Sequence, residues 1–292
     1  MNVGFIGLGI MGNPMSTNLV QKGFNVYVYD LLPENVKKLE EIGAHGVSSY
    51  KEMAENCEVV ITMLPNWPHV EKAFLGEDGI AKYIAKGSLL IDCSSVAPEQ
   101  SKRICGELNK LGLRMLDAPV SGGHAGAVAG KLSIMVGGEE KDYLEAKPIF
   151  EALGNGGVLI GPIGAGNTAK IANQIMVAAN LAAAAEALTL AEKSGLDMSK
   201  VWDAVKGGFA GSTAAAGRME KILSNNYEAS FAIDTHWKDL NNALDAGYAV
   251  DSPTPLTLQI FNMFNYLRAE GLGKCDHSAV KKYYEEHAGI KK

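Results

Sequence analysis

Short apolar runs alternate with helix-like stretches along the first half of the chain. The apolar runs, which predict strands, are VGFIG, NVYVYD, EVVITML, SLLIDCS, LRMLDAP, LSIMVGG and GVLIG. The stretches between most of them, such as PENVKKLEEIG and PEQSKRICGELNKLG, carry apolar residues at helical spacing. Strands that alternate with helices in this way form βαβ units. The pattern therefore predicts a doubly wound, mostly parallel α/β sheet over residues 1–162.

The pattern changes after residue 162. A glycine-rich segment, GPIGAGNTAK, is expected to act as a hinge. It leads into KIANQIMVAANLAAAAEALTLAEKSG, a helical pattern of 26 residues. From there to Lys292 only helical signals appear, with breaks at GGFAGS, SNNY and DSPTP. We therefore expect an all-α second domain over residues 163–292, linked to the first by the long helix.

The turn between the first strand and the first helix carries three glycines, Gly7, Gly9 and Gly12, in the spacing G-x-G-x-x-G. In a dinucleotide-binding turn one glycine makes the tight bend, one lets the backbone approach a pyrophosphate, and one allows close helix packing. The helix N-terminus then offers N–H groups to the phosphates. The alternative is an ordinary glycine-rich turn. The strand–turn–helix context predicts a Rossmann-type cofactor domain, with the cofactor contacted by Gly7, Leu8, Gly9, Ile10, Met11 and Gly12.

Asp30 ends the second predicted strand, 18 residues after Gly12. An acidic side chain near this position accepts hydrogen bonds from the ribose hydroxyls of NAD and repels the 2′-phosphate of NADP. The next two residues, Leu31 and Leu32, are not basic. The alternative is a helix cap or a solvated strand end. The sequence thus predicts NAD, with NADH preferred over NADPH.

Composition narrows the class of protein. The chain has 292 residues, 47% of them apolar, and a net charge of −6, which argues against nucleic acid or an anionic membrane as a partner. The apolar stretch 171–190 is interrupted by Asn and Glu, and we expect it to be too polar to span a membrane. No signal-like segment begins the chain, so a soluble, cytoplasmic protein is expected.

The cysteines and histidines show no metal-binding pattern. The four cysteines lack a C-x-x-C pair and are expected to be free thiols in a reducing compartment. His124, His236 and His277 are each expected to be isolated from other ligands, so no metal is predicted.

A nicotinamide cofactor implies hydride transfer to or from a carbonyl carbon, whose oxygen then needs a proton donor or acceptor. Lys170 is expected in the first turn of the long helix, with Asn173 and Gln174 three and four residues later on the same face. Because this helix begins where the sheet ends, its face could look into a cleft between domains. The alternative is a solvated lysine near a helix start.

Other candidates follow the predicted strands, where open α/β sheets bind their ligands. Ser121, Gly122 and Gly123 would form a backbone nest for a carboxylate, or a simple sheet-edge turn. Two segments that follow predicted strands could also contact the cofactor. Their candidate residues are Leu64, Pro65 and Ser95. Lys238 could close over a ligand, although Lys238–Asp239 is a surface ion pair by default and His236 is expected to be structural.

These motifs, in this order, resemble the β-hydroxyacid dehydrogenase family. The matching segments are GFIGLGIMGNPM, ITMLPN, DAPVSGGHAGAVAGKLSIMVGG, GAGNTAKIANQ, HWKDL and DHSAVKKYYE. The resemblance implies a Rossmann-type domain followed by an all-α domain, a small carboxylate-bearing substrate and a homo-oligomer. It also implies that Lys170 is catalytic, that Ser95 and Lys238 lie by the cofactor, and that the substrate is held by Ser121, Gly122, Gly123 and Asn173.

At two places this chain differs from the hydroxyisobutyrate enzymes of the family, and these differences narrow the choice of substrate. Hydroxyisobutyrate enzymes show two asparagines where this chain has Asn173–Gln174, and a serine-rich turn where it has GGFAGS. Both features resemble the tartronate semialdehyde reductases, which implies reduction of tartronate semialdehyde (2-hydroxy-3-oxopropionate) to D-glycerate. A 3-hydroxyisobutyrate or other β-hydroxyacid dehydrogenase is the alternative. A non-catalytic NAD-binding module would not need Lys170 and Asn173.

Overall fold

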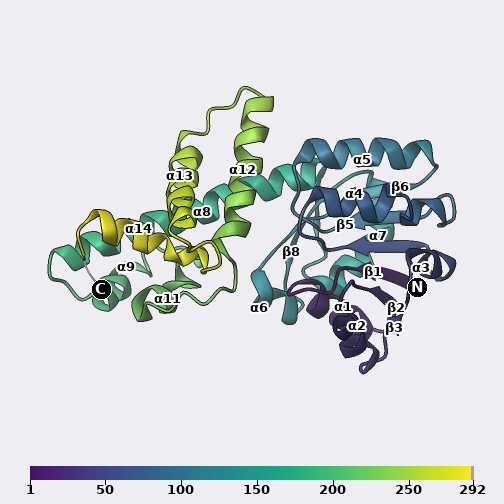
Figure 1. Cartoon of the computed structure of the whole chain (residues 1–292), viewed down its shortest axis with the longest axis horizontal. Helices are drawn as coiled ribbons and strands as arrows, with labels where there is room; N and C mark the ends of the chain where they lie inside the picture. The colour runs from purple at the N-terminus through teal and green to yellow at the C-terminus, as the bar shows by residue number, and fades with distance from the viewer. Residues whose placement is uncertain (291–292) are drawn as a thin grey trace. The chain divides into compact units, whose positions relative to one another are not determined.

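A computed structural model describes residues 1–290 of the chain (Figure 1). The first part alternates strands and helices as the apolar pattern predicts. Its strands are β1 (Asn2–Ile6), β2 (Asn25–Tyr29), β3 (His45–Gly46), β4 (Val59–Thr62), β5 (Leu89–Asp92), β6 (Arg114–Asp117), β7 (Val120–Ser121), β8 (Ser133–Gly137) and β9 (Val158–Gly161). Two of these, β3 and β7, are two residues long and were not predicted, because so short a pairing leaves no apolar pattern.

The strands form one sheet in the order β3-β2-β1-β4-β5-β6-β8-β7, with β9 paired to β8. The run from β3 to β6 is parallel, and its order is that of a dinucleotide-binding Rossmann sheet. β8 runs antiparallel to its neighbours β6 and β7, and β9 runs parallel to β8. The predicted doubly wound, mostly parallel sheet is therefore confirmed.

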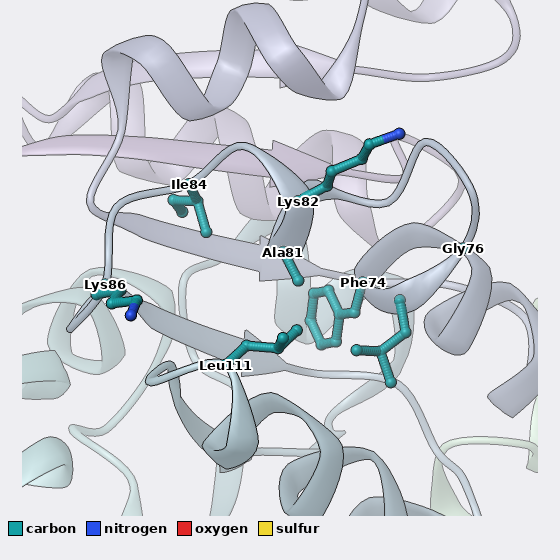
Figure 2. A pocket seen from close by; sticks show the side chains of 8 residues that line it. Phe74, Gly76, Ala81, Lys82, Ile84, Lys86 and Leu111 are labelled. Atoms are coloured by element: carbon teal, nitrogen blue, oxygen red, sulfur yellow. The ribbon is translucent and has the colours of Figure 1, made fainter.

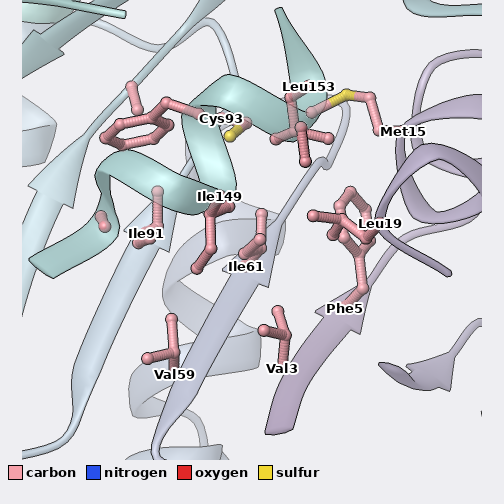
Figure 3. Close-up of a cluster of buried hydrophobic side chains, with 14 of the residues drawn as sticks. Val3, Phe5, Met15, Leu19, Val59, Ile61, Ile91, Cys93, Ile149 and Leu153 are labelled. Atoms are coloured by element: carbon pink, nitrogen blue, oxygen red, sulfur yellow. The ribbon is translucent and has the colours of Figure 1, made fainter. Parts of the chain in front are cut away.

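Helices cover both faces of this sheet. They are α1 (Gly12–Gln21), α2 (Pro33–Glu40), α3 (Tyr50–Asn56), α4 (Trp67–Leu75), η1 (Ile80–Lys82), α5 (Pro98–Lys110), α6 (Gly123–Val128) and α7 (Glu140–Leu153). One apolar cluster joins Val3 and Phe5 of β1 to Leu19 of α1 and Ile149 of α7 (Figure 3). A second cluster lies on the other face, under α3, α4 and α5. Because both faces are buried, the central strands are almost wholly apolar.

The second part of the chain is helical, as predicted. It comprises α8 (Ala165–Lys193), α9 (Met198–Val205), α10 (Thr213–Ala216), α11 (Met219–Ser224), α12 (Ile233–Ala249), α13 (Pro255–Ala269), η2 (His277–Ala279) and α14 (Val280–His287). Its core includes Leu181, Trp202, Leu240 and Phe264. The chain divides into two compact units after Lys170, so the division falls inside α8.

The long helix α8 differs from its prediction in two respects. It begins at Ala165, inside the expected hinge, so Lys170 lies in its second turn rather than its first. Its most apolar 18-residue window also has a mean hydropathy of 1.4, enough by length and composition to cross a membrane. The expectation that its polar residues make it too polar to span is therefore wrong as a compositional argument. Of that window 44% is buried in the protein, and the core helix of a soluble protein passes the same test of length and composition.

Candidate active site

The glycine loop after β1 has a backbone that other residues could not adopt. Gly7 has φ +94°, and a Cβ on it would collide with the carbonyl oxygen of Met63 at the end of β4. A Cβ on Gly12 would collide with the carbonyl oxygen of Gly7. Two of the three glycines are thus required by close backbone packing at the start of α1.

The middle of this loop is open and fits a cofactor pyrophosphate. Gly9 is exposed, and a Cβ added there would meet no atom within 4 Å. The N-cap of α1, Met11, makes no side-chain capping hydrogen bond. Backbone N–H groups at this helix start are therefore suited to an anionic group, as in dinucleotide-binding turns.

The Asp30 carboxylate ties the glycine loop to the end of β2. Its Oδ2 accepts a hydrogen bond from the Leu8 N–H at 2.6 Å, and its Oδ1 accepts one from the Leu32 N–H at 2.8 Å. Asp30 is only half-buried, and Leu31 beside it is 81% exposed. Oδ1 also accepts a longer hydrogen bond from Asn35 Nδ2 at 3.4 Å. A carboxylate has about four lone-pair positions, so these bonds still leave room for a ribose hydroxyl.

A buried polar cluster that the sequence did not single out lies where β4 and β5 end. Ser94 Oγ accepts a hydrogen bond from the Leu64 N–H at 2.9 Å, which joins the two predicted cofactor segments. Asp92 Oδ1 in turn accepts bonds from the Ser94 N–H and the Thr62 hydroxyl. Burial raises the pKa of Asp92 to about 6. Ser95, the predicted residue, is half-buried next to this cluster.

Asp117 and Asn167 fix the start of α8. Asp117 Oδ1 accepts from the Gly164 N–H and Oδ2 from the Asn167 N–H, both at 2.7 Å. The Asn167 side chain accepts from the Val96 N–H and donates to Ser101. This cap explains why the second half of the glycine-rich segment, from Ala165 on, is helical. The only sequence signal was an acidic residue at a strand end.

Lys170 lies one turn after Asn167 and is only 8% exposed. The alternative of a solvated surface lysine is therefore wrong. A lysine so deeply buried is rare without partners and is a common feature of proton-transferring sites.

Two glycines connect β7 to the short helix α6. Gly122 and Gly123 both have positive φ, +140° and +60°, and both are exposed. Ser121 before them is half-buried and pairs with Ser133 of β8. Successive backbone groups of this kind can receive an anion.

In the helical unit, α8 and α12 share a chain of polar contacts. Asn173 Nδ2 donates to Gln174 Oε1 at 2.8 Å, and Gln174 Nε2 donates to Asp239 Oδ2 at 2.6 Å. Lys238 Nζ lies 3.2 Å from Asp239 Oδ1. Asp239 is 4% exposed, so the pair is not the surface ion pair expected by default.

The histidines also differ from expectation. His236 and His277 are not isolated, because their Nδ1 atoms lie 2.9 Å apart in the core. Two histidines 41 residues apart in sequence leave no spacing signal that could reveal this contact. Over residues 1–290, no group of three potential ligands could hold a metal ion.

The pocket shown in Figure 2 lies away from all of these residues. It is lined by Phe74, Leu75, Gly76, Ala81, Lys82, Ile84, Lys86 and Leu111. Several of these residues precede β5 and β6, at the amino ends of the strands. The glycine loop follows β1, and ligands of open α/β sheets bind at the carboxyl ends. The pocket therefore is not the candidate site.

Comparison with known proteins identifies the family. Residues 2–164 match the NAD binding domain of 6-phosphogluconate dehydrogenase, and residues 164–284 match the NAD-binding domain of NADP-dependent 3-hydroxyisobutyrate dehydrogenase. A 2-hydroxy-3-oxopropionate reductase of Escherichia coli is 41% identical over 291 residues, covering 100% of this chain and 99% of that protein. The chain belongs to the β-hydroxyacid dehydrogenase family.

Relatives with another substrate name are almost as similar. A 3-hydroxyisobutyrate dehydrogenase of Pseudomonas aeruginosa is 40% identical over 295 residues, covering 97% of this chain and 98% of that protein. The crystal structure of a 3-hydroxyisobutyrate dehydrogenase from Salmonella typhimurium superposes with a TM-score of 0.89 at 32% identity, covering 97% and 99% of the two chains. The predicted fold class and family are thus confirmed: the protein is an NAD(P)-binding oxidoreductase.

Proposed function

We propose that this oxidoreductase reduces tartronate semialdehyde to D-glycerate with NADH, reversibly. The observation that carries the proposal is Lys170, buried on a helix whose start is fixed by Asp117. The 41% identity to a 2-hydroxy-3-oxopropionate reductase supports this substrate. The 40% identity to a 3-hydroxyisobutyrate dehydrogenase supports that acid as the second candidate.

The proposed residues come from both predicted domains, the NAD-binding domain of residues 1–162 and the all-α domain of residues 163–292. Asp30 binds the adenosine ribose. Ser121 to Gly123 hold the substrate carboxylate together with Asn173. The remaining cofactor contacts are Gly7, Leu8, Gly9, Ile10, Met11, Gly12, Leu64, Pro65, Ser95 and Lys238. We further propose a soluble, cytoplasmic homo-oligomer.

Reduction of the aldehyde needs one proton for each hydride that is transferred. A bound reduced nicotinamide supplies the hydride for the aldehyde carbon. Negative charge grows on the aldehyde oxygen, and the Lys170 ammonium donates a proton to it. The product is the alcohol of D-glycerate, and the neutral amine regains a proton from water. In the reverse direction the neutral amine of Lys170 removes the alcohol proton.

Replacement of Lys170 tests the catalytic role. Lys170→Ala removes donor and charge together, and we expect kcat to fall at least ~10²-fold, since general acid help is worth that much. Lys170→Arg should rescue poorly, because a guanidinium scarcely gives up its proton. Lys193→Ala is the matched control, since Lys193 is exposed in the last turn of the same helix. The NADH dissociation constant should change little, and near-normal kcat in Lys170→Ala would contradict the role.

A substrate panel tests the rest of the proposal. NADH oxidation is compared with tartronate semialdehyde and with glycolaldehyde, which lacks the carboxylate, and NAD⁺ reduction is measured with 3-hydroxyisobutyrate. We expect the highest kcat/KM with tartronate semialdehyde and little activity with glycolaldehyde. Higher efficiency with 3-hydroxyisobutyrate would move the proposal to the second candidate.

The same assay tests the cofactor. We expect higher kcat/KM with NADH than with NADPH, because Asp30 disfavours a 2′-phosphate. Asp30→Ser combined with Leu31→Arg should shift the preference toward NADPH. An unmodified enzyme that already prefers NADPH would overturn this assignment.

A further inference from the structure

A line of hydrogen bonds crosses the helical unit from Arg218, the N-cap of α11, to α8. Arg218 Nε lies 3.0 Å from His277 Nε2, the two histidine Nδ1 atoms lie 2.9 Å apart, and His236 Nε2 lies 3.3 Å from the Gln174 carbonyl oxygen. Both rings are buried, with 0% exposure for His236 and 3% for His277.

Elementary hydrogen-bond chemistry gives this line a direction. A guanidinium can only donate, so Arg218 donates to His277 Nε2, which carries no proton. The proton of a neutral His277 is then on Nδ1, which donates to His236 Nδ1. His236 therefore carries its proton on Nε2 and donates it to the Gln174 carbonyl. Every ring nitrogen in the line has one assigned role.

The surroundings hold the line in this state. Asp276 Oδ1 lies 3.3 Å from Arg218 Nε, and its two oxygens also accept hydrogen bonds from Ser230, Phe231 and Ser278. Burial, reinforced by His236 and Arg218, lowers the pKa of His277 well below its ordinary value, although Asp276 opposes this. A neutral His277 agrees with the donor and acceptor pattern.

The line ends beside the predicted substrate residue. His236 and Asp239 are three residues apart on α12, and both reach Gln174, one at its backbone oxygen and the other at its side chain. Gln174 Oε1 accepts the hydrogen bond of Asn173. Gln174 is thus held at two points by α12, and it holds Asn173.

We propose that His236 and His277 are positioning residues. Both rings are neutral and have fixed tautomers, and together they form a relay that orients Gln174. Gln174 in turn orients Asn173 toward the substrate. The functional half of this inference rests on the proposed role of Asn173, whereas the tautomers do not.

The tautomers are measured by long-range proton–nitrogen NMR on protein labelled with ¹⁵N-histidine at neutral pH, with His236→Gln and His277→Gln used for assignment. We expect the proton of His277 on Nδ1 and that of His236 on Nε2. A doubly protonated ring, or a proton on Nδ1 of His236, overturns the relay whatever the substrate.

The positioning role is tested with two variants of one residue. His236→Gln keeps an N–H near the position of Nε2, whereas His236→Asn keeps polarity only near Nδ1. We expect His236→Asn to raise KM for the aldehyde about tenfold, as loss of one oriented hydrogen bond implies. The KM of His236→Gln for the aldehyde should lie within about threefold of that of the parent enzyme.

Two further measurements separate positioning from stability and from the choice of substrate. Melting temperatures and NADH dissociation constants are measured for both variants, and we expect the latter to match the parent enzyme. Equal KM values in the two variants would overturn the positioning role, even if both are destabilised. If the enzyme prefers another acid, the same KM comparison is made with that acid.

Discussion

Gly166, in the first turn of α8, provides a sharp test of how the helix start positions Lys170. A Cβ added there would lie 2.5 Å from the carbonyl oxygen of Asp117 and closer still to that of Met135. Both oxygens are backbone atoms of sheet strands, which cannot shift without disturbing the hydrogen bonds of the sheet. Gly166→Ala should therefore push the first turn of α8 away from β6 and β8.

The geometry sets the size of the effect. Ordinary contact for a Cβ begins at 3.4 Å, so the helix start must move by about 1 Å. Overpacking of this kind costs roughly 1–3 kcal/mol, and the better helix propensity of alanine offsets about 1 kcal/mol. Lys170 lies one turn further on the same face, and a displacement of about 1 Å at a reacting group can lower the rate ~10²-fold. We expect kcat to fall by at least about tenfold, with a small loss of stability.

The assay combines urea unfolding, followed by circular dichroism, with steady-state NADH oxidation. The matched control is Gly106→Ala, because Gly106 is also a helical glycine but a Cβ there would meet nothing within 4 Å. That variant should gain up to about 1 kcal/mol and keep its kcat. If Gly166→Ala keeps its kcat within about twofold, a difference smaller than 1 kcal/mol of barrier, the coupling between helix start and Lys170 is refuted.

Two further predictions concern buried charges. Burial raises the pKa of Asp92 from 3.8 to about 6, so the stability it lends is complete below about pH 4 and is lost as pH rises through about 6. The unfolding free energy of the parent minus that of Asp92→Asn should therefore fall by about 3 kcal/mol over this range, and a flat difference would contradict it. Lys281, with 0% exposure, contacts Glu192 and Glu285 at 2.8 Å. Lys281→Met should lower the unfolding free energy by about 3–5 kcal/mol in urea titrations, whereas Lys274→Met, at a 92% exposed lysine, should change it by less than about 1 kcal/mol; similar losses in both would count against the buried triad.

The sequence by itself determined the alternation of strands and helices and the change to an all-helical second part. Those features follow from local periodicity, which each segment carries without reference to the rest of the chain. The glycine loop was also predictable, because the positive φ of Gly7 and the close approach of Gly12 to the Gly7 carbonyl are both local to the turn. The family followed from motifs of the same local kind.

The tertiary structure alone decided how the candidate residues are held. The cap on α8 joins Asp117 to Asn167 across 50 residues, and the histidine pair joins residues 41 apart. It also revealed that Lys170 and Asp239 are buried. Burial and partnership depend on which distant segments pack around a side chain, and desolvation by those segments sets its charge state. A local pattern carries no record of either, because the residues that exclude the water lie elsewhere in the chain.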